Sequence, residues 1–249
     1  MWRWDGQKWS DTADSVFSAG CDPGTRGMAV LEKDMLIDKA MEDPRALLWD
    51  GTRYTLLRAR GEFVFFDPGG NILSRFTSSR PMMYGGVPLA WSGNQYGYIY
   101  APSGGSGRFG IFDRDAHLIT ASSDVIFTNK LFVFWTGEEY MVVGFVWSAP
   151  WKNCAEQIAL MRFDANGAEI GSIMTLVSTD PNCYGDFAAT FTDGSLAIAW
   201  LEQSDLNRKV RFAVFDPDGG SLVPTMEVQE YSLQRFISNM EVAERGGSY

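Results

Sequence analysis

The chain has 249 residues, of which 45% are hydrophobic and 14% aromatic, and this composition excludes a disordered or collagen-like protein. Its net charge of −10 at pH 7 argues against nonspecific binding to nucleic acids or anionic membranes, because affinity for phosphate depends on clustered Lys and Arg. No apolar stretch approaches the roughly 20 residues that span a bilayer, and residues 1–4 lack the basic and apolar regions of a signal peptide, so we expect no membrane insertion.

A short motif marks each predicted repeat: an apolar run that ends in an aromatic residue, a turn that contains Gly, and then a second aromatic or apolar residue. The motif begins at residues 4–9 and recurs at 49–54, 91–96, 135–140 and, more loosely, 191–196; residues 246–249 begin it once more. Its marker glycines are about 42 to 57 residues apart, which is the period of repeats that form blades.

The second repeat indicates how each copy folds. Its apolar runs predict four strands, which we name a, b, c and d, at Ala46 to Trp49, Tyr54 to Arg60, Glu62 to Asp67 and Asn71 to Thr77. Asp-Gly and Gly-Gly pairs between the strands predict tight turns, because hairpin turns require positive φ. The c–d turn carries a second marker, Phe-Asp, at 66–67, 112–113, 163–164 and 215–216, with a degenerate copy at Leu31-Glu32-Lys33-Asp34.

The predicted repeats span approximately residues 1–45, 46–85, 86–125, 130–182 and 185–230, within a single domain of residues 1–249. No segment of helical length has a sustained period of 3.6 residues, so we expect an all-β fold. One small sheet cannot bury both faces alone, and a ring of such sheets leaves only short strand edges exposed. The sequence therefore predicts a β-propeller of four-stranded antiparallel blades, five in number, with six as the alternative. Residues 231–249 would supply a closing strand or part of a further repeat.

The two markers together resemble the propeller-like repeats of secreted and surface proteins of bacteria such as myxobacteria, whose pattern is approximately W-D-G-x-x-Y-L-V-x-W followed by F-D-x-x-G. The match covers almost the whole chain; it is closest at residues 193–200 and at the four Phe-Asp turns, and the first repeat departs from it. The resemblance implies a blade architecture and an extracellular or cell-surface location. It carries no agreed activity and no catalytic residues.

The two ends of the predicted blades differ. The a–b and c–d turns share one end and are short, whereas the b–c and d–a connections share the other end and vary in length, as binding loops on repetitive scaffolds do. Cys21, Cys154 and Cys183 all map to this variable end. Their positions permit a Cys154–Cys183 disulfide, which would contribute about 3–4 kcal/mol by closing a loop of about 30 residues; free thiols are the alternative.

The best candidate for a binding site also lies at the variable end. Residues 147–154 and 180–184 bring aromatic rings, amides and a carboxylate together. Aromatic faces stack on the apolar faces of sugars, and Asn and Asp share hydrogen bonds with hydroxyls, so a glycan is a chemically sensible ligand. We predict ligand-binding roles for Trp151, Lys152, Asn153, Asp180, Asn182 and Tyr184; the alternative is that Trp147 packs between blades and Trp151 covers the core of its own loop.

Two sets of repeated residues favour structural roles. Trp4, Trp49, Trp91 and Trp135 stand at the end of strand a, where we expect packing between sheets. The Asp of each Phe-Asp pair is expected to cap its own turn, since calcium loops need several closely spaced oxygen ligands. With three Cys and a single His, we expect no metal site and no cofactor.

These observations favour a non-enzymatic module that binds a glycan or a protein through its variable loops. One alternative is a carbohydrate-active hydrolase, which would need a pair of carboxylates about 5–10 Å apart in the central channel. Asp186 and Glu241 stand near predicted starts of strand a and are the candidates for that pair. A second alternative is a structural module of a larger secreted or surface protein.

Overall fold

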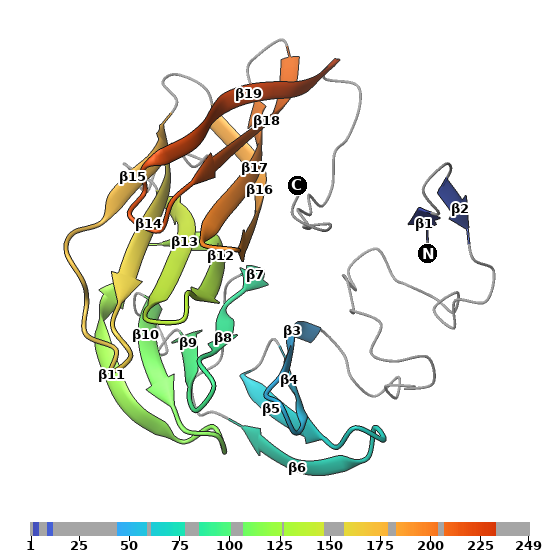
Figure 1. Cartoon of the computed structure of the whole chain (residues 1–249), viewed down its shortest axis with the longest axis vertical. Helices are drawn as coiled ribbons and strands as arrows, with labels where there is room; N and C mark the ends of the chain where they lie inside the picture. Colours follow the sequence, from blue (N-terminus) through green and yellow to red (C-terminus); the bar gives the residue numbers. More distant parts are fainter. Residues whose placement is uncertain are drawn as a thin grey trace.

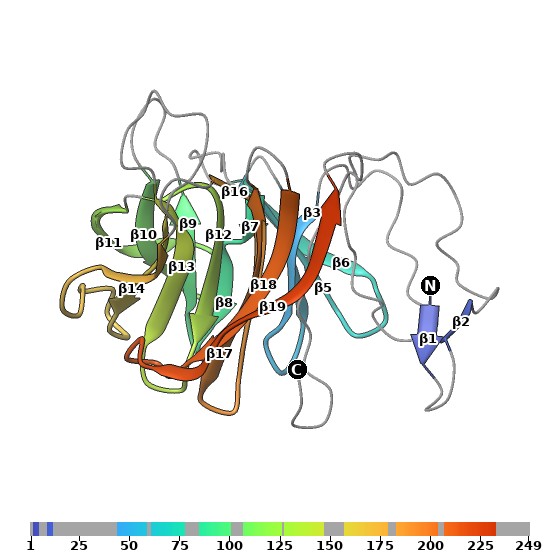
Figure 2. The ribbon, with the colours of Figure 1, turned by 90° about the horizontal axis from the view of Figure 1, so that it is seen from above.

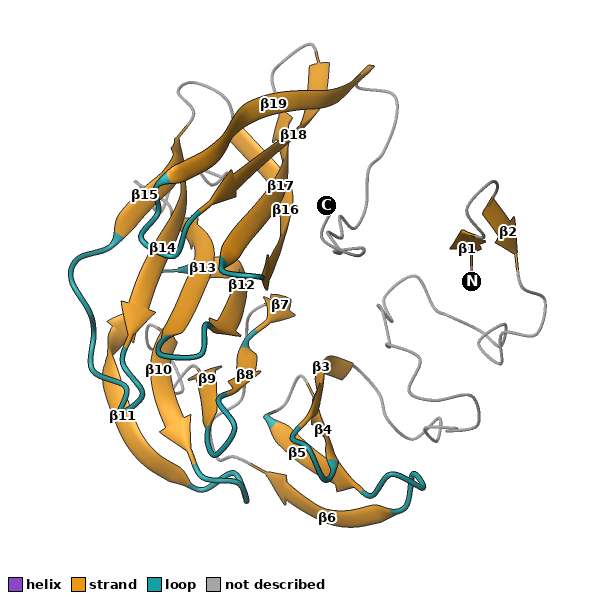
Figure 3. Ribbon diagram, viewed as in Figure 1, coloured by secondary structure: helices purple, strands orange, loops and turns teal. Residues whose placement is uncertain are grey.

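The structure is a computed structural model that describes residues 2–4, 9–11, 44–58, 61–77, 85–100, 107–125, 127–146, 157–178, 183–203 and 207–232. All regular structure in these residues is β-strand, which confirms the predicted all-β fold (Figure 3). Across the same ranges, no helix is long and apolar enough to cross a membrane.

The second to fifth repeats each form a set of four antiparallel strands in chain order, as predicted, and in the sheet of the fourth repeat a fifth strand from the third repeat is added beside strand a. We call these sheets blades 2 to 5, after their repeats. Blade 2 contains β3 (Pro44–Trp49), β4 (Tyr54–Arg58), β5 (Glu62–Phe66) and β6 (Ile72–Thr77); blade 3 contains β8 (Leu89–Trp91), β9 (Tyr96–Tyr100), β10 (Gly107–Phe112) and β11 (Leu118–Val125). Blade 4 contains β12 (Thr128–Trp135), β13 (Tyr140–Val146), β14 (Gln157–Phe163) and β15 (Met174–Ser178); blade 5 contains β16 (Cys183–Thr192), β17 (Ser195–Gln203), β18 (Asn207–Phe215) and β19 (Ser221–Ser232). In the first repeat, β1 (Trp2–Trp4) and β2 (Trp9–Asp11) form a hairpin.

The four blades stand side by side in an arc (Figure 1). Strand a of each blade lies on the concave side and strand d on the convex side. The a strands of successive blades approach one another, since β3 contacts β8, β8 contacts β12, and β12 contacts β16. This is the radial arrangement of propeller blades around an axis.

Strand a of the third repeat divides its pairing between two blades. Its first part, β7 (Gly85–Val87), pairs in parallel with β12 of blade 4, and its second part, β8, pairs with β9 of its own blade. Pro88 separates the two parts, and its carbonyl accepts a hydrogen bond from Ile99 N–H at 2.9 Å. Blades 3 and 4 are therefore joined by backbone hydrogen bonds as well as by side-chain packing.

Aromatic side chains fill the spaces between neighbouring blades. Phe63 of blade 2 meets Tyr98 of blade 3 edge-on at 5.4 Å, and Phe109 of blade 3 stacks on Phe163 of blade 4 at 4.3 Å. Between blades 4 and 5, the ring centroid of Phe187 lies 5.2 Å from that of Phe132 and 4.5 Å from that of Phe145. Because the core lies between the sheets, each blade depends on its neighbours for burial.

One buried hydroxyl between blades 2 and 3 has no hydrogen-bond partner among the residues that the structure describes. Tyr98 is fully buried, its hydroxyl is unpaired, and burial raises its pKa. By contrast, the hydroxyl of Tyr96 lies 2.6 Å from Thr55 Oγ1. An unpaired buried hydroxyl costs about 1–3 kcal/mol.

We therefore expect opposite outcomes when each hydroxyl is removed. Tyr98→Phe should leave the free energy of unfolding unchanged or raise it by about 1 kcal/mol, because no hydrogen bond is lost. Tyr96→Phe should lower it by about 1–2 kcal/mol, because Thr55 then loses its buried partner. Urea unfolding of the two variants provides the comparison, and a Tyr98→Phe variant as unstable as Tyr96→Phe would contradict it.

Candidate functional site

Most of the predicted ligand-binding residues lie outside the described part of the chain. These residues are Trp151, Lys152, Asn153, Asp180 and Asn182, and Cys154 and Glu241 lie outside it too. The backbones of Cys183 and Tyr184 are described: they begin β16 and pair with Gln203 and Glu202 of β17. The binding site and the disulfide therefore remain predictions.

The described strand ends place the variable connections at one end of the blades. The b–c connections leave from Tyr100, Val146 and Gln203, and the d–a connections leave from Val125 and Ser178. The antiparallel registers bring these ends together, at the upper edge of the arc in Figure 2, while the short turns lie at the lower edge. β16, whose second residue is Tyr184, begins at this end of the blades, where the sequence predicts binding.

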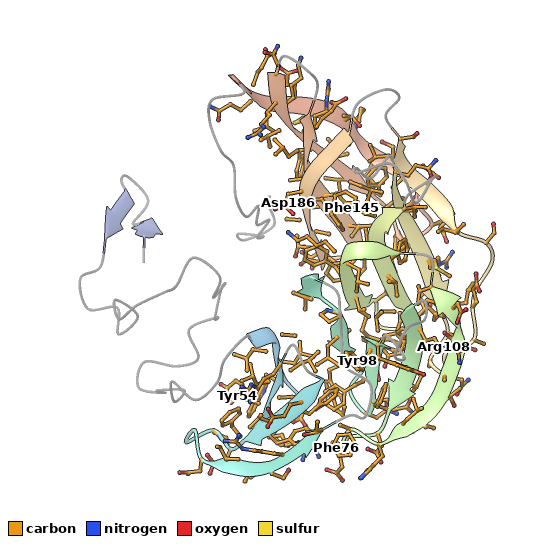
Figure 4. All side chains as sticks on the ribbon, turned by 180° about the vertical axis from the view of Figure 1, so that it is seen from behind. Tyr54, Phe76, Tyr98, Arg108, Phe145 and Asp186 are labelled. Atoms are coloured by element: carbon orange, nitrogen blue, oxygen red, sulfur yellow. The ribbon has the colours of Figure 1, made fainter. Side chains whose placement is uncertain are left out.

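Asp186 is the single carboxylate on the described a strands. It lies on β16 at the concave edge of the arc (Figure 4) and forms an ion pair with Lys130 of β12, with 2.8 Å between Oδ1 and Nζ. Lys130 Nζ also lies 5.7 Å from the centre of the Phe132 ring. Asp186 therefore links blades 4 and 5 through this ion pair, and its Oδ1 also accepts a hydrogen bond from the backbone N–H of Phe187 at 2.9 Å.

Of the four repeated Trp residues at the opposite end, the side chain of Trp4 lies outside the described part of the structure, and the other three follow the prediction only in part. Each of the three stacks at an angle on the Tyr opposite it in its own hairpin, with centroids 4.5–4.6 Å apart. The pairs are Trp49–Tyr54, Trp91–Tyr96 and Trp135–Tyr140. Trp91 and Trp135 also pack against the core between blades, but Trp49 is 45% exposed. Their constant position thus reflects a cross-strand pair within each blade more than burial between blades.

The Asp residues of the Phe-Asp turns cap their own turns, as predicted. Asp113 Oδ1 accepts hydrogen bonds from the backbone N–H groups of Asp115 and His117 at 2.9 and 2.8 Å. The equivalent contacts are those of Asp67 with Asn71, of Asp164 with Ala168 and of Asp216 with Gly220. Within the described ranges, no group of three or more His, Cys, Asp and Glu residues could hold a metal ion.

A charged network that sequence reasoning missed joins blades 2 and 3 at the turn end. Asp50 of the a–b turn in blade 2 has a side chain with no exposed surface. Its two oxygens accept hydrogen bonds from Nε and Nη2 of Arg114, in the c–d turn of blade 3, both at 3.0 Å. In return, Arg53 of blade 2 pairs with Asp115 of blade 3 at 3.2 Å. The network holds the two turns in a fixed relative position.

A similar network joins blades 4 and 5. Arg162 of β14 pairs with Glu139 of its own blade and with Asp218 in the c–d turn of blade 5, both at 2.6 Å. Asp115 and Asp218 each stand two residues after the Asp of a Phe-Asp pair. That shared offset was the one signal in the sequence that could have indicated a contact between blades.

Asp50 should make stability depend on acid pH. Burial alone raises its pKa, but hydrogen bonds from the Arg114 side chain and from the N–H groups of Arg53 and Thr52 outweigh burial and lower the pKa to about 2. The unfolded carboxylate has an ordinary pKa near 3.8. The folded state therefore gains stability from Asp50 above that pH and loses it as the pH falls towards 2.

We expect this contribution to be about 1–2 kcal/mol, allowing for solvent screening. Urea unfolding at pH 5 and pH 2.5 measures it when the protein is compared with its Asp50→Asn variant, whose residue 50 does not titrate. The variant should lose less stability between the two pH values, and equal losses would contradict the role given to Asp50.

Comparisons with known proteins identify no family for this chain. No protein-family model matches it, and no curated protein does. Similar solved structures include a mutant of the apocarotenoid oxygenase of Synechocystis, with 11% identity, a TM-score of 0.45, and coverage of 74% of this chain and 50% of that one. The Dos1 propeller has 11% identity and a TM-score of 0.45, with coverage of 74% and 47%. BamB from Moraxella catarrhalis has 12% identity and a TM-score of 0.39, with coverage of 73% and 58%. This chain therefore spans about half the length of the solved structures it matches.

Proposed function

We propose that the protein is a non-enzymatic binding module, built as a five-bladed β-propeller, that presents its b–c and d–a loops to a glycan. The observation that carries the proposal is the contrast between the two ends of the blades. At the turn end, an ion pair that buries the carboxylate of Asp50 ties blade 2 to blade 3, and an exposed pair between Arg162 and Asp218 ties blade 4 to blade 5. The connections that differ most between repeats leave from the other end, where a rigid scaffold can hold binding loops.

A total of five blades is supported by the outer face of blade 2, at one end of the arc. Leu56, Val64 and Phe66 form a separate cluster on the face of blade 2 that turns away from blade 3, and all three are buried. An apolar sheet face needs a second layer. The first repeat, whose β1–β2 hairpin is already an antiparallel pair, is the part of the chain that would form the fifth blade.

The arrangement around Asp186 favours binding over glycoside hydrolysis. A glycosidase needs two carboxylates, one of which must carry a proton to donate to the leaving group. Asp186 has no second carboxylate beside it on the described a strands, and the structure instead places it in an ion pair with Lys130 that links blades 4 and 5. An extracellular or cell-surface location is part of the proposal and is supported by the resemblance of the repeats.

A glycan array tests the proposal directly. We expect selective binding that falls at least about tenfold in both Trp151→Ala and Tyr184→Ala, because each loses a stacking surface. Trp49→Ala is the matched control: it removes an exposed Trp at the turn end and should leave binding unchanged. A blank array would overturn the glycan as ligand, and binding that survives both loop substitutions would overturn the site.

A further inference from the structure

In the arc, the c–d turns of blades 3, 4 and 5 each lie beside a strand of the preceding blade. The ring of His117 contacts Phe76, Gly167 lies where an added Cβ would meet Ile111, and Gly219 lies where an added Cβ would meet Met174. The ring of His117 meets Phe76 edge-on at 5.4 Å, and a Cβ on Gly219 would lie 3.4 Å from the sulfur of Met174. At all three junctions the c–d turn therefore lies beside the preceding blade, next to strand d at two of them and next to strand c at the third.

The register shows that Met226 occupies the same place in blade 5. Phe76, Met174 and Met226 each lie on strand d, opposite the residue of strand c that precedes the Phe-Asp turn by three positions. Those partners are Phe63, Leu160 and Phe212. Phe76 and Met174 are partly buried, whereas Met226 is 49% exposed. Met226 thus lies where the turn of a following blade would cover it.

Charge indicates which turn would fit there. Between blades 2 and 3, Asp50 of an a–b turn binds Arg114 of the following c–d turn. Blade 5 carries an exposed Asp193 at the tip of its a–b turn, with a φ of 47°. The degenerate copy Leu31-Glu32-Lys33-Asp34 aligns with Phe112-Asp113-Arg114-Asp115 and puts Lys33 in the place of Arg114.

We propose that the c–d turn of the first repeat, residues 31–34, docks on the surface formed by Met226 and Asp193 and closes the ring. Lys33 pairs with Asp193 at the turn end, and apolar side chains beside it cover Met226. This inference rests on the proposed five-bladed ring. It is independent of the ligand, so a blank glycan array leaves it standing.

A zero-length cross-link tests the occupant in the full chain. A carbodiimide joins a Lys amine to a carboxylate only when the two are in contact. We expect peptide mass spectrometry to find Lys33 joined to Asp193, and in a mixture of light and heavy isotope-labelled protein both ends should carry the same label. A link between a light and a heavy chain would mean that a second copy occupies the surface. Either that result or the absence of any link between Lys33 and Asp193 would overturn the proposal.

A pair of substitutions on β19 tests the surface itself. Leu222 is the control because it is 53% exposed on the same strand, at a position whose counterparts Leu73 and Ile119 are also exposed in blades 2 and 3. Met226→Lys should lower the Tm by at least about 4 °C, because it puts a charge into an apolar contact, and Leu222→Lys should change it by less than about 2 °C. Equal small shifts would show that Met226 is an ordinary surface residue and would overturn the proposal.

Discussion

Gly86→Ala should lower the free energy of unfolding by more than about 4 kcal/mol, or prevent folding, because the position admits no side chain. Gly86 pairs with Leu131 of β12 in the parallel contact between blades 3 and 4. A Cβ at residue 86 would lie 2.0 Å from the carbonyl oxygen of Leu131 and 2.9 Å from its carbonyl carbon. The backbone also has a φ of +92°, which L-residues rarely adopt. Relief of the clash would require β7 to leave β12.

Gly51→Ala is the matched control for this experiment. Gly51 has a φ of +93°, and a Cβ there would meet no atom within 4 Å. Gly51→Ala should therefore lower the free energy of unfolding by only about 1–2 kcal/mol, which is the cost of holding a residue with a Cβ at positive φ. Equilibrium unfolding in urea measures both variants. If the two substitutions cost the same, the parallel contact between β7 and β12 does not hold the blades together.

Arg114→Met should lower the free energy of unfolding by about 2–3 kcal/mol, because it leaves the buried carboxylate of Asp50 without its bidentate partner. Both oxygens of Asp50 are bound by Arg114, and the carboxylate has no exposed surface. Arg53 Nε is still 3.3 Å from Asp50 Oδ2 in this variant, so a positive charge remains beside the buried carboxylate. The loss of stability should therefore be smaller than that caused by a buried charge with no partner.

Arg108→Met provides the control, since Arg108 pairs with Asp124 at 2.9 Å in an exposed position. Surface pairs contribute about 0–1 kcal/mol, so this variant should be nearly as stable as the parent. The double variant Asp50→Asn, Arg114→Met should recover part of the loss, because no charge is then left buried. A double variant that loses the sum of the two single effects would contradict a direct interaction.

Much of the fold could be predicted because each repeat carries local signals. Trp49 and Tyr54 flank a Gly turn, and the structure pairs them directly across β3 and β4. The Phe-Asp turns likewise cap themselves through contacts within five residues, so their geometry is encoded locally. These signals set the strand order inside each blade.

Contacts between blades were harder to predict because they depend on residues that do not repeat. Arg53 and Arg114 have no counterparts at the same positions of blades 4 and 5, where Arg162 of β14 makes the contact with Asp218 of the next blade instead. The switch of β7 to the neighbouring blade is marked only by Pro88, which is compatible with an ordinary loop as well. Side-chain exposure was also unpredictable: Trp49 and Trp91 occupy equivalent positions, but only Trp49 is largely exposed.

For the binding site, the sequence could indicate an end of the blades but not a geometry. The strand ends at Val146 and Tyr184 lie at the predicted end, because the order of four antiparallel strands leaves them there. Long loops lack the periodicity from which strands are predicted, so the mutual arrangement of Trp151 and Asp180 does not follow from spacing.

The central claim is that the five repeats form one closed ring of blades around a common axis. A crystal structure of the full chain tests it most directly. We predict that residues 1–43 complete a fifth sheet between β3 and β16, with its c–d turn against Met226. A first repeat that packs on a second copy of the chain, or a ring that contains a sixth sheet, would contradict the account.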